Sequence, residues 1–220
     1  MAPTAQPGLF ISLEGGEGSG KSTQMKRLQS WLQEILPETP IITTREPGGT
    51  NSAEAIRALL VTGTPDSLTA KTEALLMLAS RVEHVERLIL PKLAQGAILL
   101  CDRFADSSFV YQTITGGYDE TQLRALHEVS IGSITPDSTF LMDLPPEEGL
   151  ARAGERASQT EDRFEAKGLA YHEQVRTGYL AIAESEAERV TVIDASASED
   201  VIFTQLQAAI TKLLRERGFV

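Results

Sequence analysis

The stretch LFISLEGGEGSGKST, residues 9–23, joins an apolar run to a glycine-rich turn and the start of a helical pattern. The turn matches G-x-x-x-x-G-K-[ST] through Gly15, Gly20, Lys21 and Ser22, in the strand–turn–helix context that this motif requires. Glycines let successive backbone N–H groups converge on phosphate oxygens, and the helix N-terminus adds partial positive charge. The stretch therefore predicts a loop that binds a nucleoside triphosphate together with Mg²⁺.

Individual residues of this loop have different expected tasks. Lys21 carries a full charge to the β- and γ-phosphates, and the Ser22 hydroxyl is a Mg²⁺ ligand. Glu17 is unusual, because a carboxylate repels polyphosphate; it faces either metal-bound water, a hydroxyl of the acceptor substrate, or solvent. The predicted ATP-binding residues are Gly15, Gly16, Glu17, Gly18, Ser19, Gly20, Lys21, Ser22 and Thr23.

Short apolar runs alternate with helical patterns along the rest of the chain. Periodic apolar residues predict helices over 21–36, which Pro37 ends, and over 72–90, with Pro91 near its end. A short helix follows the second strand, two more lie either side of Gly116 and Gly117, and the last spans about 198–216. The predicted strands are 9–14, 41–46, 97–102, 138–143 and 189–194.

This alternation predicts an α/β fold. Strands separated by helices pair in parallel through right-handed crossovers, so we expect a three-layer P-loop fold with a five-stranded parallel sheet flanked by helices. Parallel sheets bind ligands beyond the carboxyl ends of their strands. The acids that close the predicted strands therefore indicate the edge of the sheet where ligands bind.

Length and composition suit one domain, 1–220, in a reducing compartment. The net charge of −11 disfavours general binding to nucleic acid or to an anionic membrane. Cys101 is the only cysteine, which excludes an internal disulfide and a cysteine-rich zinc site and favours the cytoplasm. No apolar run approaches the roughly 20 residues of a membrane span.

The segment 152–168, RAGERASQTEDRFEAKG, is polar and dense in charge. One interpretation is a solvated helix–loop surface. The other is a short lid that carries arginines over the phosphate loop.

Arginines near the predicted strand ends indicate a second anion site. Arg45 and Arg103 lie at the ends of the second and third strands, and Arg57 follows on the short helix. Arg81 lies within an apolar stripe, where a charge is rarely buried without a partner. Asp102 and Arg103 together suit a metal-linked acid and a base that bridges phosphates, which indicates phosphoryl transfer between two anions.

The chain resembles the thymidylate kinases of bacteria over nearly its whole length. TREPGGT together with DRxxxSSxxYQ is highly specific, whereas a phosphate loop alone is not. The segments that carry the resemblance are LEGGEGSGKST (13–23), TREPGGT (44–50), IRALL (56–60), the run ending in Arg81, DRFADSSFVYQ (102–112), Pro136–Asp137 and DRFE (162–165).

The resemblance implies a role for each matching position. Arg103 bridges the transferring group, Arg81 reads the thymine edge, and Tyr111 packs under the deoxyribose and disfavours a 2′-hydroxyl. The implied catalytic residues are Lys21, Arg103, Glu17 and Arg156. Arg156, alone or with Arg152, matches the lid arginine of family members whose loop, like this one, lacks an arginine. The implied metal residues are Ser22 and Asp102, directly or through water. The implied substrate-binding residues are Glu46, Pro47, Arg57, Met77, Arg81, Arg103, Ser107, Ser108, Tyr111 and Gln112.

One position departs from the family pattern. Met77 stands where family members commonly place a phenylalanine that stacks on thymine. A methionine also packs against a ring through its polarisable sulfur, or it serves the core alone.

The implied reaction is Mg²⁺-dependent transfer of the ATP γ-phosphoryl to dTMP, giving dTDP and ADP, by a cytoplasmic homodimer. Three alternatives remain at this stage. The chain could phosphorylate another monophosphate such as dUMP, dGMP or CMP. It could be a nucleotide-dependent switch or partitioning ATPase, which needs no second arginine cluster, or a binding module without catalysis.

Overall fold

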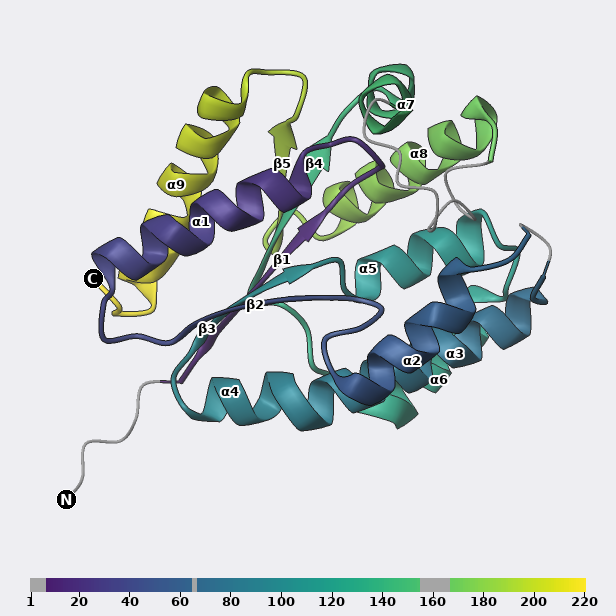
Figure 1. Ribbon diagram of the computed structural model, residues 1–220, viewed down its shortest axis with the longest axis horizontal. Coiled ribbons are helices and arrows are strands. Elements are labelled where there is room, and N and C mark those ends of the chain that lie inside the picture. The colour runs from purple at the N-terminus through teal and green to yellow at the C-terminus, as the bar shows by residue number, and fades with distance from the viewer. Residues whose placement is uncertain (1–6, 65–66, 155–166) are drawn as a thin grey trace.

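The computed structural model describes residues 7–64, 67–154 and 167–220, which form an α/β structure around one sheet (Figure 1). The five strands are all parallel and lie in the order β2-β3-β1-β4-β5. Every predicted strand is confirmed to within one residue. The strands are β1 (Leu9–Glu14), β2 (Ile41–Arg45), β3 (Ile98–Asp102), β4 (Ser138–Asp143) and β5 (Val190–Asp194).

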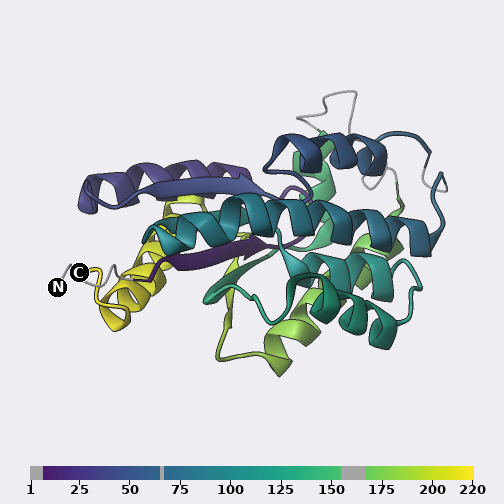
Figure 2. The ribbon, with the colours of Figure 1, turned by 90° about the horizontal axis from the view of Figure 1, so that it is seen from below.

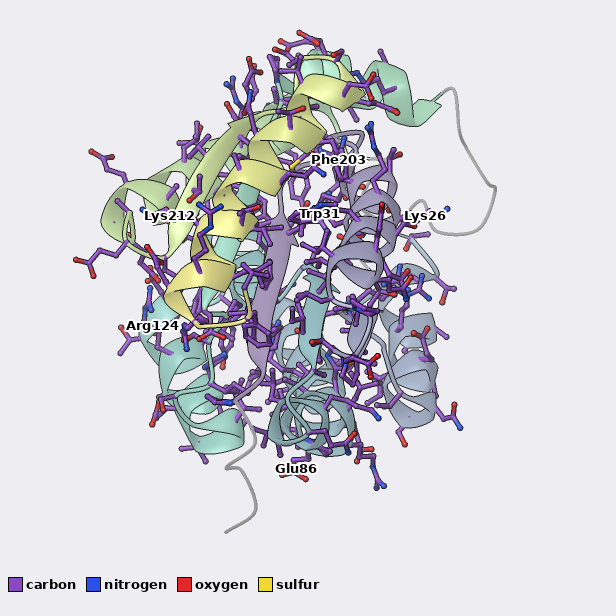
Figure 3. The ribbon with its side chains drawn as sticks, turned by 90° about the vertical axis from the view of Figure 1, so that its left-hand side faces the viewer. Lys26, Trp31, Glu86, Arg124, Phe203 and Lys212 are labelled. Carbon is purple, nitrogen blue, oxygen red and sulfur yellow. The ribbon has the colours of Figure 1, made fainter. Side chains whose placement is uncertain are left out.

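Helices α1 (Lys21–Ile35) and α9 (Glu199–Glu216) cover one face of the sheet. Alternate residues of the central strands, such as Leu9 and Ile11 of β1, pack against the buried leucines and isoleucines of both helices. Trp31 and Phe203 point toward each other between the two helices (Figure 3), with ring centroids 6.5 Å apart in an edge-to-face arrangement. Both helix predictions are confirmed, and the period-2 pattern explains why intervening residues face the other layer.

The second layer packs on the opposite face. There Phe10, Leu99 and Cys101 meet Val85 and Ile89 in one apolar cluster. A neighbouring cluster joins the far strands to a helix that the sequence analysis does not predict, α8. The elements beyond α1 and α9 are α2 (Asn51–Val61), α3 (Ala70–His84), η1 (Val85–Ile89), α4 (Leu90–Ala94), α5 (Ala105–Ser108), η2 (Phe109–Ile114), α6 (Glu120–Ile131), α7 (Pro146–Gly154) and α8 (Leu169–Ser185).

The long helix predicted over 72–90 is confirmed but extends past Pro91. It runs from Ala70 to Ala94 as α3, the π-helical turn η1 and α4, and Figure 2 shows it in teal as one rod across the molecule. A proline lacks an N–H, and its ring crowds the carbonyl four residues earlier. The wider turn before it, where Leu90 N donates to Val85 O, carries the helix past this position.

The expected ligand-binding residues lie at the carboxyl ends of the strands. Residues Glu14, Asp102, Asp143 and Asp194 close β1, β3, β4 and β5, as the sequence predicts. The phosphate loop starts directly after Glu14. Most of the predicted lid, including Arg156, lies outside the described residues. Among the described helices, none is long and apolar enough to cross a bilayer.

Candidate active site

The glycine-rich loop turns sharply between β1 and α1. Gly15, Gly18 and Gly20 have φ angles of 136°, 69° and 85°, which side chains other than glycine rarely adopt. A Cβ at Gly15 would also lie 2.5 Å from the carbonyl oxygen of Met142 in β4. Bare backbone is therefore required here, and the open N-terminus of α1 leaves N–H groups for an anion.

Lys21 lies across the inside of this loop. Its Nζ donates to the carbonyl oxygens of Gly15 at 3.0 Å and Gly16 at 2.9 Å, and to Ser19 Oγ at 3.2 Å. Burial and the nearby charge of Arg103 lower the pKa of the ammonium, and surrounding carboxylates partly oppose this. The loop thus holds a cation where the phosphates of a nucleotide would lie, and the loop carbonyls satisfy it.

Ser22 and Asp102 meet at the expected metal position. Ser22 Oγ donates to Asp102 Oδ2 at 3.4 Å. Asp102 Oδ1 is buried and has no hydrogen-bond partner within the part of the chain that is described. A free carboxylate oxygen beside a hydroxyl fits Mg²⁺, which takes one or two protein ligands and completes its shell with phosphate oxygens and water. The described residues include no cluster of three or more His, Cys, Asp or Glu side chains suited to a metal.

Arg103 is the centre of the site. Its backbone has a φ of 70°, unusual for a residue with a Cβ, and its amide donates to Leu13 O at 2.9 Å. The guanidinium donates to Glu17 Oε1 at 2.7 Å and to the Tyr179 hydroxyl at 2.8 Å, and it lies 5.2 Å from the centre of the Tyr111 ring. Burial raises the pKa of Glu17, but Arg103 and Lys21 outweigh this, so the net shift is downward. The Glu17–Arg103 pair is therefore ionised.

Glu14 stabilises the position of Arg103 through the residues around it. The sequence analysis does not identify Glu14 as a site residue. It accepts from Phe104 N at 2.6 Å, from Ser107 Oγ at 2.7 Å and from the Tyr179 hydroxyl at 3.1 Å. Ser107 is an expected substrate-binding residue, and in the structure its hydroxyl donates to Glu14 and lies 2.7 Å from the Tyr179 hydroxyl. Its role in substrate binding stays a prediction. Glu14 thus binds the backbone N–H of Phe104, the residue after Arg103, and the Tyr179 hydroxyl that accepts from Arg103. These contacts fix both the backbone and the guanidinium of Arg103.

The buried Glu14 carboxyl predicts a pH-dependent stability. Burial first, and then the charge of Asp106, raise the pKa of Glu14 from 4.5 to about 7 in the folded protein. Since the folded state binds this proton more tightly than the unfolded state, the stabilisation is complete below about pH 4.5 and is lost as the pH rises toward 7. The loss is on the order of 3 kcal/mol for such a shift. Replacing Glu14→Gln is expected to remove this contribution.

Urea unfolding of the unchanged protein and of Glu14→Gln between pH 5 and 8 measures the contribution of Glu14 to the free energy of unfolding. The free energy of unfolding of Glu14→Gln should fall less steeply with pH than that of the unchanged protein. Glu38→Gln, at an exposed position, is the matched control and should leave the slope as it is. Equal slopes for all three proteins would contradict the raised pKa.

Arg81 is fully buried, with 1% of its surface exposed. Nε donates to Glu46 Oε2 at 2.7 Å, and Nη2 donates to Phe104 O at 3.1 Å and to Ser108 Oγ at 2.9 Å. Nη1 is buried and lacks a hydrogen-bond partner among the described residues. One donor of this guanidinium is therefore left for a ligand.

Glu46 is one of the expected substrate-binding residues, and the structure pairs its carboxylate with Arg81 and His84. His84 Nδ1 lies 2.9 Å from Glu46 Oε1, and His84 Nε2 lies 2.7 Å from Thr44 Oγ1. Burial raises the pKa of Glu46, but Arg81 and His84 outweigh this and lower it overall. Without Glu46 the Arg81 charge would be buried unpaired, at a cost of about 3–5 kcal/mol, so Glu46 stabilises the buried Arg81. Its role in substrate binding stays a prediction.

The remaining expected residues surround these two centres. Arg57 Nη1 donates to Pro47 O at 3.0 Å, and the Glu46–Pro47 bond is cis. Met77 lies between Glu73 and Arg81 along α3 and is buried. Arg152, at the end of α7, donates to Ala195 O at 3.0 Å and reaches Glu148 at 3.5 Å, so it is directed toward β5. The expected role of Arg156 stays a prediction.

The chain is similar to known proteins over nearly its whole length. The family model described as "Thymidylate kinase" matches residues 13–206. Thymidylate kinase of Caulobacter vibrioides is 48% identical over 207 residues, 94% of this chain and 98% of that protein. Thymidylate kinase of Oleidesulfovibrio alaskensis is 45% identical over 207 residues, 92% and 97% of the two chains.

A solved structure, that of thymidylate kinase from Ehrlichia chaffeensis, has the same fold. It superimposes with a TM-score of 0.74 at 31% identity and covers 93% of this chain and 100% of that one. The match of the family model includes the phosphate loop, Arg81 and Arg103. On these grounds the chain belongs to the thymidylate kinase family.

Proposed function

We propose that this chain is an ATP-dependent nucleoside monophosphate kinase that transfers the γ-phosphoryl group of ATP to dTMP, giving dTDP and ADP. The observation that carries the proposal is the place of Arg103, whose guanidinium contacts Glu17 of the phosphate loop and Tyr179 of α8. A cation fixed there offsets the repulsion between two phosphorylated substrates, which is the main task in phosphoryl transfer. The printed name of the relatives supports dTMP as the acceptor.

The donor phosphates would bind to the loop. Backbone N–H groups of 15–20 and of the first turn of α1, including Thr23, face an anion at the helix N-terminus. Lys21 Nζ, now on the loop carbonyls, would exchange these neutral acceptors for phosphate oxygens. A charge-assisted hydrogen bond is stronger than a neutral one, so the exchange favours nucleotide binding.

Ser22 and Asp102 would hold Mg²⁺, directly or through water. When bound, the ion supplies positive charge to the transferring phosphates. Asp102 Oδ1, which lacks a partner among the residues described, would gain one by this binding. The Ser22 hydroxyl, which donates to Asp102 in the structure, would instead offer its oxygen to the metal ion.

Transfer would proceed in line, without a covalent enzyme intermediate. A phosphate oxygen of dTMP forms the new P–O bond as the bond from the γ-phosphorus to the bridging oxygen of ADP breaks. Arg103 and Lys21 neutralise the charge that develops, together with Arg156, which we place on a lid over 152–168. Closure of this lid would exclude water and so limit ATP hydrolysis.

The acceptor would lie between α3 and the α5–η2 segment. Arg81 Nη1, Ser108 and Gln112 are the polar groups for the base, and the flexible side chain of Met77 would pack against the ring. Tyr111, whose ring lies beside the Arg103 guanidinium, would pack under the deoxyribose. Near the monophosphate we place Arg57, the backbone of Pro47, and Glu17, whose carboxylate would face the sugar hydroxyl region.

We also propose a cytoplasmic homodimer. Exposed leucine and valine side chains stand on four helices, namely Leu59 of α2, Leu75 of α3, Leu90 of α4 and Val129 of α6. Apolar groups gathered on neighbouring elements are typical of subunit contacts. The helices α2, α3 and α6 lie together in Figure 1.

A coupled assay of ADP release tests the proposed function. ADP formation from Mg·ATP should be slow alone and should rise by at least about 10²-fold with dTMP, with dTDP appearing in equal amount, as expected for a positioned acceptor. The same assay with dUMP, dCMP, dGMP and CMP defines the acceptor. Release of ADP that is independent of every monophosphate would instead favour a switch ATPase.

A further inference from the structure

Glu73 and Gln112 form a buried contact that the proposed reaction does not use. Glu73 lies in the first turn of α3 and Gln112 in η2, and they are 7% and 1% exposed. Gln112 Nε2 donates to Glu73 Oε1 at 3.0 Å. A second hydrogen bond, from Arg81 to Ser108, joins α3 to the end of α5, directly before η2, so the two contacts lie on either side of the proposed base site.

The contact with Glu73 determines which end of the Gln112 amide faces away from α3. An ionised carboxylate only accepts hydrogen bonds, whereas an amide has one donating and one accepting end. The NH₂ group must therefore face Glu73, whatever ambiguity otherwise attends the amide orientation. The other end, Oε1, is buried and accepts no hydrogen bond from any residue that the structure describes.

Arg81 offers a hydrogen-bond donor that complements the Gln112 acceptor. Its Nη1 is a buried donor without an acceptor in the described ranges, as its other nitrogens contact Glu46, Phe104 and Ser108. Helical side chains lean toward the N-terminus of their helix, which directs Arg81 toward Met77 and Gln112 toward Ser108. A donor and an acceptor without partners among the described residues therefore both lie where α3 packs against the α5–η2 segment.

This donor–acceptor pair discriminates between pyrimidines. A thymine or uracil ring presents the O4 acceptor next to the N3–H donor, which matches Arg81 Nη1 and Gln112 Oε1. Cytosine presents a donating amino group and an accepting N3. Its amino group would face the donor Arg81 Nη1, and its N3 would face the acceptor Gln112 Oε1, so neither hydrogen bond would form. If the Gln112 amide turned over, its NH₂ would face the base, and the acceptor for N3–H would be lost.

We propose that Glu73 is a specificity-determining positioning residue, which holds the Gln112 amide in the orientation that accepts from N3–H of thymine and rejects cytosine. The proposal rests on the function proposed above and adds a residue that does not itself contact the base. If the contact were only a link between helices, its loss would weaken all monophosphates alike.

The test is Glu73→Gln, with dissociation constants for dTMP and dCMP measured by titration calorimetry and kinetics measured with dTMP. An amide at 73 accepts or donates, so Gln112 is free to turn over. The ratio of the dCMP to the dTMP dissociation constant should fall by about tenfold or more, because an unpaired buried polar group is what rejects the wrong base. KM for dTMP should rise, while kcat stays within about twofold because the transfer step is untouched.

A charge-swapped variant makes the test sharper. In Glu73→Gln combined with Gln112→Glu, the amide at 73 donates to a carboxylate at 112, which has only accepting oxygens for the base. This pair should restore the preference for dTMP over dCMP. Glu83→Gln, farther along α3 and paired with surface Arg87, is the matched control and should change neither dissociation constant.

The outcomes separate the two proposals. If the unchanged protein fails to bind or phosphorylate dTMP, the proposed function is wrong. If it phosphorylates dTMP but folded Glu73→Gln keeps the original ratio, only the role of Glu73 is refuted. A ratio that falls in the single variant and is not restored in the swapped pair would also overturn it, because packing would then explain the loss.

Discussion

Replacing Arg103→Ala is expected to lower kcat by about 10³-fold or more, the range found for arginines that stabilise transferring phosphoryl groups. The side chain contacts Glu17 of the loop and Tyr179 of α8 rather than the loop glycines. Binding of ATP should therefore stay within a few-fold of normal, since Lys21 and the loop amides remain. Steady-state kinetics with dTMP, together with ATP affinity from calorimetry, measure the two effects separately.

Two further variants control this experiment. Arg87→Ala removes an exposed arginine from an i,i+4 pair with Glu83 and should leave kcat unchanged, because such pairs contribute little. Tyr179→Phe removes one acceptor of the Arg103 guanidinium but leaves its charge, so it should cost less than Arg103→Ala. Normal turnover in a folded Arg103→Ala protein would refute the bridging role.

The elements that position Arg103 could be predicted from the sequence. A fully buried strand followed by G-x-x-x-x-G-K-[ST] is typical of a phosphate loop, and the spacing of the motif places Lys21 and Ser22 on the first turn of α1. The acid–arginine pair Asp102–Arg103 is local too, since it follows directly from the end of β3. Patterns of this kind are read from neighbouring residues, and the structure confirms the fold around them.

The support of the site could not be predicted, because it joins distant elements. Glu14 appears in the sequence as the last residue of an apolar strand, and only the alternation of β1 directs it to the face where Ser107 and Tyr179 lie. Tyr179 is 76 residues from Arg103 along the chain and stands on a helix without a motif. The pairing of His84 with Glu46 likewise depends on how α3 meets the end of β2.

An ionisable residue within an apolar helical stripe predicts a buried partner. Arg81 within an apolar stripe indicated a partner, and that partner is Glu46. The same reasoning applies to Glu73, four residues before Met77 on the same stripe of α3, because helical residues four apart share a face. A carboxylate on a buried face calls for a hydrogen-bonding partner, and the structure supplies Gln112.

The second large effect is expected for Lys21→Ala, which should abolish measurable transfer, a loss of at least about 10³-fold as for other groups that stabilise developing charge. Unlike Arg103, Lys21 lies inside the loop that binds the donor, so ATP affinity should fall as well. Kinetics with dTMP and calorimetry with ATP check both expectations.

The matched comparisons are Lys21→Arg and Lys26→Ala. An arginine keeps the charge but replaces a compact ammonium by a planar fork. The ammonium now fits between the carbonyls of Gly15 and Gly16 at 3.0 and 2.9 Å, where the fork would press on the loop backbone. Lys21→Arg should therefore stay inactive, whereas Lys26→Ala, on the exposed side of α1, should remain active. Substantial activity of Lys21→Arg would mean that charge alone suffices, and would refute the claim that the shape of the loop selects a lysine.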